Sequence, residues 1–126
     1  MDPNDLKYAR DHEWARAEGD RATVGITDYA QTQLNEIVYV DLPAVGTAVT
    51  GGRPFGEVES TKSVSDLYSP VSGTIVGRND ALDKNPELIN ADPYGQGWLI
   101  VVEMTDPGEL DQLMDADAYA QIVAEA

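Results

Sequence analysis

Short runs of β-branched and aromatic residues, separated by Gly, Pro and Asn about every ten residues, are the feature that most constrains the fold. They occur in the order R-A-T-V-G-I, E-I-V-Y-V-D-L, T-A-V-T, P-F-G-E-V-E, G-T-I-V-G and G-W-L-I-V-V-E-M. Short strands with frequent turns are typical of a mainly β protein, either a sandwich or a flattened barrel. The 126 residues suffice for one core, so we expect a single domain over residues 1–126.

The N-terminal runs predict an opening β-hairpin followed by a helix. H-E-W-A-R-A and R-A-T-V-G-I flank the turn-like cluster E-G-D, so that Trp14 and Val24 are expected to face the core. The next stretch, T-D-Y-A-Q-T-Q-L, offers Thr27 or Asp28 as a helix cap. It predicts a short helix near residues 28–34.

A second hairpin and a helical C-terminus complete the expected fold. P-F-G-E-V-E and the run after Lys62 predict a hairpin around residues 54–70, with S-T-K-S as its turn. Over residues 106–125 the apolar residues change to helical spacing, with Asp and Pro at the starts. We therefore expect a C-terminal helical segment that covers one face or end of the sheet.

The pattern Pro-x-x-Gly-Thr occurs on both sides of Lys62, at residues 43–47 and 70–74. Two similar strand and turn units packed about a pseudo-twofold axis would produce this repeat. Two unrelated turns that use the same residues would produce it as well. The residues alone leave both interpretations open.

The composition excludes several classes of function. Eight basic against 23 acidic residues give a formal net charge of -15, which repels nucleic acids and anionic membranes. This charge serves solubility, adapts the chain to its host, or steers it towards basic patches on partner proteins. No apolar run approaches the roughly 18 residues of a membrane span, and the start resembles neither a signal nor a transit peptide. These observations predict a cytoplasmic protein.

Catalysis and metal binding have few candidate residues. The chain has no cysteine, one histidine and no G-x-S-x-G motif, so it lacks the material for a thiolate site, a zinc centre or a serine hydrolase. Lys62 is expected in a solvated turn, where a lysine is protonated and a poor nucleophile. Its local features alone favour an ordinary surface lysine, although an exposed amine on a rigid turn also suits an acylating enzyme.

A resemblance to a known family changes the interpretation of Lys62. The segment G-E-V-E-S-T-K-S-V-S-D-L-Y-S-P-V-S-G resembles the lipoylation hairpin of glycine cleavage system H proteins. D-H-E-W, G-I-T-D-Y-A-Q, L-N-E-I-V-Y-V-D-L-P and N-A-D-P-Y-G-Q-G-W-L are similar to that family in the same order. Biotin carriers usually have methionines beside the lysine, and lipoyl domains more often have Asp-Lys-Ala. The resemblance implies a barrel-sandwich hybrid fold of the lipoyl and biotinyl type.

The resemblance also implies a cofactor and partners. Lipoic acid would be joined to Lys62 by an amide, and the protein would be a carrier rather than an enzyme. It would take an aminomethyl group from glycine decarboxylase (P protein) to the tetrahydrofolate-dependent aminomethyltransferase (T protein). Dihydrolipoamide dehydrogenase (L protein) would then reoxidise the dithiol, and lipoate-attaching enzymes would be further partners.

Five other residues gain roles only through the resemblance. Glu59, Gly46 and Gly73 match positions associated with recognition by the attaching enzyme. Asp66 and Glu13 match positions that dock the cationic aminomethyl arm, although locally each reads as one solvated carboxylate among many.

Two alternatives remain. One is a relay of lipoyl or octanoyl groups to 2-oxo acid dehydrogenases, and the other is an unmodified interaction module. A further lysine, Lys84, lacks the hairpin context and is expected in a solvent-facing loop.

Overall fold

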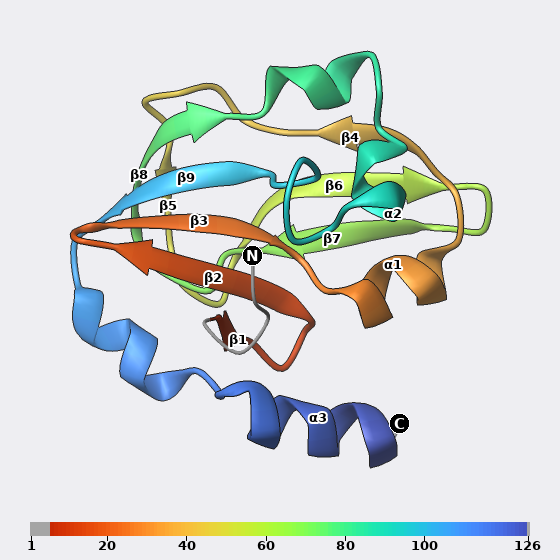
Figure 1. Cartoon of the computed structure of the whole chain (residues 1–126). Coiled ribbons are helices and arrows are strands. Elements are labelled where there is room, and N and C mark those ends of the chain that lie inside the picture. Colours follow the sequence, from red (N-terminus) through yellow and green to blue (C-terminus); the bar gives the residue numbers. More distant parts are fainter. Residues whose placement is uncertain (1–5, 126) are drawn as a thin grey trace.

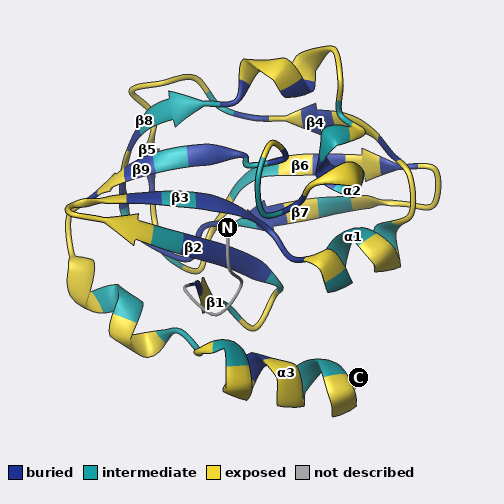
Figure 2. Ribbon diagram, viewed as in Figure 1, coloured by how far each residue is buried: buried dark blue, intermediate teal, exposed yellow. Residues whose placement is uncertain are grey.

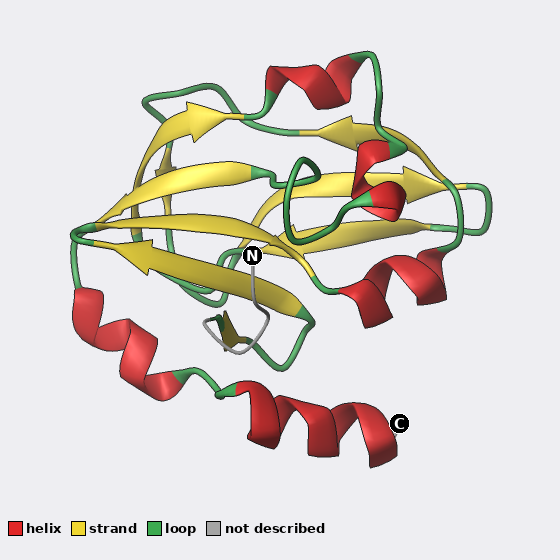
Figure 3. Cartoon of the chain, viewed as in Figure 1, coloured by secondary structure: helices red, strands yellow, loops and turns green. Residues whose placement is uncertain are grey.

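The computed structural model describes residues 6–125, so the ends of the predicted 1–126 domain lie outside the described residues. The chain is mainly β, with two separate sheets and short helices (Figures 1 and 3). The strands are β1 Lys7–Tyr8, β2 Glu13–Glu18, β3 Arg21–Ile26, β4 Ile37–Asp41, β5 Ala48–Val49, β6 Pro54–Ser60, β7 Val64–Tyr68, β8 Gly73–Arg78 and β9 Ile100–Met104. The helices are α1 Asp28–Leu34, α2 Leu88–Ala91 and α3 Ala116–Glu125, with 3-10 turns at Asp80–Asp83 and Pro107–Gln112.

The two sheets are not closed into a barrel. One has six strands in the order β1-β2-β3-β9-β8-β5, and the other has three in the order β4-β6-β7. All pairings in both sheets are antiparallel. The expected mainly β fold of the barrel-sandwich hybrid type is therefore confirmed, as a sandwich rather than a closed barrel. Its two predicted hairpins are formed by β2 with β3 and by β6 with β7.

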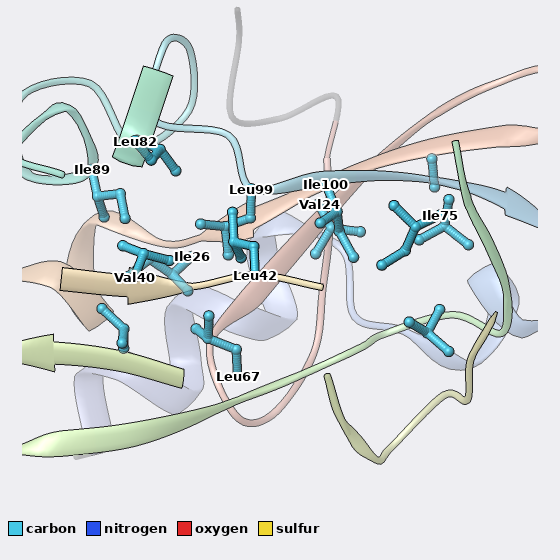
Figure 4. Close-up of a cluster of buried hydrophobic side chains, with 14 of the residues drawn as sticks. Val24, Ile26, Val40, Leu42, Leu67, Ile75, Leu82, Ile89, Leu99 and Ile100 are labelled. Carbon is cyan, nitrogen blue, oxygen red and sulfur yellow. The ribbon is translucent and has the colours of Figure 1, made fainter. Parts of the chain in front are cut away.

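The main core fills the space between the sheets. Figure 4 shows Val24, Ile26 and Ile100 from the large sheet approaching Val40 and Leu67 from the small one. These five side chains are at most 3% exposed. The buried segments run through both sheets, whereas the outer faces of the helices are exposed (Figure 2). Burial of these apolar side chains holds the sheets together.

The expectation that Trp14 and Val24 share one core needs correction. Both are fully buried, but Trp14 pairs with Gly25 and Val24 pairs with Ala15, so they lie on opposite faces of the sheet. Trp14 belongs to a second cluster with Leu6, Tyr8 and Tyr119. Its ring lies where a Cβ on Gly25 would stand, at 2.5 Å, so the glycine makes room for the indole. The second cluster attaches α3 to the outside of the large sheet.

The predicted helices form where expected. Thr27, rather than Asp28, caps α1, because its side chain accepts a hydrogen bond from the backbone N–H of Ala30. The C-terminal segment contains the 3-10 turn Pro107–Gln112 and α3, which passes beneath β1 and β2 in Figure 1. Within residues 6–125, no helix is both long and apolar enough to cross a membrane.

The ends of the two Pro-x-x-Gly-Thr segments, with the residues that follow them, pair with each other. Ala48 pairs with Thr74 and Val49 with Gly73 in antiparallel register. The N–H of Gly46 donates to the carbonyl of Ile75 at 2.8 Å, which extends the pairing. This reciprocal arrangement favours a local pseudo-twofold over two unrelated turns.

Candidate functional site

The turn that carries Lys62 is held by the hydroxyl of Ser60. Its Oγ accepts hydrogen bonds from the N–H groups of Lys62 and Ser63, both at 3.1 Å. The backbone N–H of Ser60 also donates to the carbonyl of Ser63 at 2.8 Å, which closes the hairpin. Thr61 donates to the carbonyl of Glu36 at 3.0 Å, which ties the turn to the segment between α1 and β4. The tip of the hairpin is therefore fixed by both local and long-range bonds.

The side chain of Lys62 projects from this turn into solvent. The residue is exposed, and its Nζ lies 3.4 Å from the carbonyl oxygen of Gln33 near the end of α1. No ion pair to Lys62 occurs among residues 6–125. In Figure 1 the β6–β7 turn projects beyond both sheets, on the side where α1 lies. An acylating enzyme can thus approach this amine.

A cleft of about 320 Å³ lies beside the turn. One wall is the segment from Asp11 to Glu13 and the other is α1, which contributes Tyr29, Ala30, Gln33 and Leu34. Ile26, Val58, Ser65 and Asp66 complete the lining. Because Gln33 both lines the cleft and contacts Lys62, the amine stands at its border. A larger hollow of about 480 Å³, near Arg10 and Gln112, does not include the lysine turn.

Glu13, on β2 of the large sheet, is hydrogen-bonded to β7 of the small sheet inside this cleft. Its local sequence reads as that of a solvated carboxylate, but Glu13 is only 2% exposed. Its Oε2 accepts a hydrogen bond from the N–H of Tyr68, on the edge strand β7, at 3.3 Å. Its Oε1 is buried and has no hydrogen-bond partner within the described residues. An unpartnered buried oxygen is costly, so this atom suits a ligand with N–H donors.

The environment of Glu13 keeps its carboxyl protonated at neutral pH. Burial, and after it the neighbouring carboxyl of Asp11, together raise the pKa of Glu13 to about 10. The N–H of Tyr68 favours the ionised form and opposes this rise. A buried group of this kind ionises when a cation comes close.

Asp66 and Glu59 lie on the hairpin itself. Asp66 is exposed on β7, at the rim of the cleft that contains Glu13. Both predicted docking residues therefore line the same cleft, Glu13 inside it and Asp66 at its rim. Glu59 is exposed on β6 and pairs with Val64, so it stands beside the lysine turn.

Gly46 and Gly73 lie apart from the lysine. They belong to the paired segments around β5 and β8, which lie at the opposite side of the molecule from the β6–β7 turn in Figure 1. Gly46 is exposed with φ of +98° and open space around it. Gly73 is buried, and a Cβ there would overlap the backbone carbonyl oxygen of Glu103. The close approach of β9 is thus a structural reason for Gly73 to be a glycine.

Several residues that shape the site were missed in the sequence. Ser60 stabilises the turn, because its hydroxyl accepts from the N–H groups two and three residues further on. A serine at this spacing is a recognisable Ser/Thr turn signal. Tyr29, Gln33 and Tyr119 offer no comparable signal, because their contacts depend on how distant elements pack. His12, expected as a strand residue, lies in a bend before β2 with φ of +72°.

Comparison with known proteins agrees with this geometry. The family model described as glycine cleavage H-protein matches residues 6–126. A glycine cleavage system H protein of Geobacillus thermodenitrificans is 52% identical over 123 residues, which is 98% of this chain and 97% of the relative. The Myxococcus xanthus protein of the same name is 53% identical over 121 residues, covering 96% and 94%.

A solved structure resembles the whole chain. The crystal structure of a glycine cleavage system H protein from Mycobacterium marinum superposes with a TM-score of 0.89 at 46% identity, covering 98% of this chain and 99% of that one. The family model and the similarity to whole relatives each extend over nearly all of the sequence. The chain belongs to the glycine cleavage H-protein family.

Proposed function

We propose that this protein is the lipoyl carrier of the glycine cleavage system, with lipoic acid attached to Lys62. Like other members of its family, it is a carrier subunit without catalytic activity of its own. The observation that supports the attachment site is the exposed Lys62 amine on a hydrogen-bonded turn, beside a cleft that contains a buried carboxyl. The family favours this role over an unmodified interaction module or a relay to other complexes.

The surroundings of Lys62 are compatible with an attached lipoyl group. An amide to Lys62 removes one charge from a solvated side chain and disturbs no ion pair within residues 6–125. When bound, lipoate supplies a dithiolane that accepts and releases an aminomethyl group and is reoxidised afterwards, which the side chains of this cysteine-free chain cannot do.

Glu13 and Asp66 would hold the ammonium group of the cargo. The free Oε1 of Glu13 would accept one of its N–H bonds, and the nearby cation would favour loss of the Glu13 proton. Asp66 at the rim would add a second negative charge. The apolar side chains of Ile26, Leu34 and Val58 would keep water from the cargo, because water releases it as ammonia and formaldehyde.

The outer face of the small sheet supports contact with partner enzymes. Asp41, Glu57 and Asp66 lie opposite one another on β4, β6 and β7, and all three are exposed. Like charges in such a cross-strand row destabilise a sheet. Their presence on the hairpin that carries Lys62 fits partners with a basic surface around the active-site entrance, and we assign this face to the P, T and L proteins.

Glu59, Gly46 and Gly73 remain our candidates for recognition by the lipoate-attaching enzymes. Glu59 is accessible next to the turn, and Gly46 is accessible on the β5 side. Gly73 is buried, so it would act by shaping the backbone there. We further propose that residues 1–126 form one domain and that the protein works in the cytoplasm.

The attachment is tested by mass spectrometry of protein from a lipoate-replete host. We expect the intact chain to be heavier by roughly 188 Da, the mass of an amide-linked lipoyl group. Peptide mapping across residues 54–78 should place the whole increase on Lys62. An unmodified chain from such a host would contradict the proposal.

Replacing the rim carboxylate should shorten the life of the cargo. In Asp66→Asn we expect normal lipoylation but loss of the aminomethyl group from the isolated protein about tenfold faster, since a charged hydrogen bond contributes roughly 1.5 kcal/mol. The release of formaldehyde from loaded protein measures this rate. Asp111→Asn is the matched control, because Asp111 is exposed on the distant 3-10 turn Pro107–Gln112. Equal rates in the two variants would dismiss the role of Asp66.

A further inference from the structure

The hydroxyl of Tyr119 lies between the two walls of the cleft. Tyr119 comes from α3, far from the hairpin in sequence, and is only 7% exposed. Its oxygen is 2.8 Å from His12 Nδ1 and 2.7 Å from Thr27 Oγ1. A single atom of the C-terminal helix therefore contacts both His12, next to Glu13, and Thr27, the cap of α1.

These two contacts link residues that form or support the two walls of the cleft. The His12 ring lines the cleft and packs on Tyr29 of α1, with ring centroids 4.9 Å apart. The backbone N–H of Thr27 also donates to the carbonyl of His12 at 3.0 Å. The Tyr119 hydroxyl thus closes a small network that sets the position of α1 relative to the segment of Glu13.

One direction of the hydrogen bonds gives a partner to the hydroxyl protons of Thr27 and Tyr119 and to His12 Nδ1. Thr27 Oγ1 accepts from the N–H of Ala30 at 3.2 Å, so its own proton can go to the oxygen of Tyr119. The hydroxyl of Tyr119 then donates to His12 Nδ1, which requires a neutral ring protonated at Nε2. Burial lowers the pKa of His12 from its ordinary value, opposed by the charge of Asp11, which agrees with a neutral ring.

Helix α1 depends on such contacts for its position. It has only seven residues and no buried one, and an isolated helix this short is unstable in water. At its C-terminal end, Asn90 Nδ2 donates to the carbonyl of Asn35 at 2.8 Å. At its N-terminal end, the N–H of Asp28 donates to the hydroxyl of Tyr94 at 3.0 Å. The hydroxyl of Tyr119 adds a side-chain link to the opposite wall, beside the backbone bond from Thr27 to His12.

We propose that Tyr119 is a positioning residue for the docking cleft, because its hydroxyl fixes α1 against the His12–Glu13 segment. The C-terminal helix thereby determines how well the cleft holds its cationic cargo. This inference rests on the proposed carrier function and adds a residue that does not itself touch the cargo.

The test uses Tyr119→Phe in the full chain, which removes one oxygen and keeps the stacked ring against Tyr8. We expect normal lipoyl mass at Lys62 and loss of the aminomethyl group roughly fivefold to tenfold faster, as for one buried hydrogen bond. The aminomethyl group is lost from the undocked arm. The rate of loss therefore rises by the same factor by which the equilibrium constant for docking falls. Formaldehyde release from loaded protein reports it.

A second measurement needs no cargo. His12 is the single histidine of the chain, so its ring gives one unambiguous NMR signal. In the hydrogen-bond direction assigned above, the hydroxyl of Tyr119 donates to a nitrogen that only the neutral ring offers as an acceptor, so its removal should raise the midpoint of the His12 titration towards the ordinary value. Asp11, whose charge acts on His12, and Tyr29, whose ring packs on it, are the same in both proteins, so they do not account for a difference.

Val123→Ala is the matched control. It weakens the packing of α3 on the second cluster but keeps the hydroxyl of Tyr119. We expect near wild-type cargo loss and an unchanged His12 midpoint in this variant. Equal cargo loss in Tyr119→Phe and wild type, or equal acceleration in both variants with no change at His12, would overturn the inference. A wild-type protein that never acquires lipoate or never protects its cargo would instead refute the proposed function.

Discussion

Lys62→Arg should abolish lipoylation and, with it, all glycine cleavage in a system reconstituted with the partner enzymes. Arginine keeps the positive charge but its guanidinium is not a substrate for amide formation at neutral pH. No other side chain of this chain can replace the dithiolane, since cysteine is absent. The fold should not suffer, because Lys62 is exposed and exposed substitutions change the free energy of unfolding by about 0.5 kcal/mol or less.

Two measurements separate this result from a folding defect. Intact mass shows whether the chain carries the lipoyl group, and glycine-dependent NADH formation shows whether it supports turnover. Lys84→Arg is the control, since Lys84 is exposed next to the 3-10 turn Asp80–Asp83, and we expect it to behave like the wild type. A lipoyl group retained on the Lys62→Arg chain would mean that attachment occurs elsewhere.

Glu13→Gln should stabilise the protein increasingly as the pH rises. The wild-type carboxyl keeps its proton in the folded state up to a pKa of about 10, whereas the unfolded chain loses it near 4.5. Between these values the folded state binds more protons than the unfolded state, so this group makes the free energy of unfolding fall with pH. The neutral amide has no such dependence. The difference between variant and wild type should grow by about 1.4 kcal/mol per pH unit.

Urea unfolding at about pH 5.5 and about pH 8.5 measures this effect. The advantage of Glu13→Gln should increase by about 4 kcal/mol over that interval, within the window where only the unfolded state ionises. Glu18→Gln, an exposed change on the same strand, should show a nearly constant difference from the wild type. A constant difference for Glu13→Gln as well would show that its carboxyl is already ionised in the folded protein.

The elements that depend on local residues could be predicted from the sequence. The runs P-F-G-E-V-E and V-S-D-L-Y on either side of S-T-K-S predict the hairpin from local residues, and the bond from Thr61 to Glu36 then ties its turn to a distant segment. Thr27 caps α1 through a bond within the same stretch of chain. Over residues 106–125 the apolar residues change from strand to helical spacing, which predicts the C-terminal helical segment. Only the resemblance implies that the lysine is an attachment point, since the local residues alone favour an ordinary surface lysine.

The character of the site depends on contacts between distant segments, which local patterns do not contain. Glu13 reads as one acidic residue among 23, and it becomes a buried group only because β7 packs beside it. The strand expected from Gly97 begins at Ile100, because Gly97 donates to the carbonyl of Asp92 in a turn after α2. Tyr119 likewise acquires its role only when α3 lies against the large sheet.

The fixed turn around Ser60 determines where the carried group can go. Because the turn fixes the start of the arm, the carried group stays within a small volume around the cleft. Its effective concentration at the cleft is therefore high and does not depend on the protein concentration. An undocked group therefore returns to its own carrier sooner than it diffuses to another one. Each protein molecule therefore protects its own aminomethyl group. A partner enzyme competes with the cleft for this group only by enclosing the same hairpin.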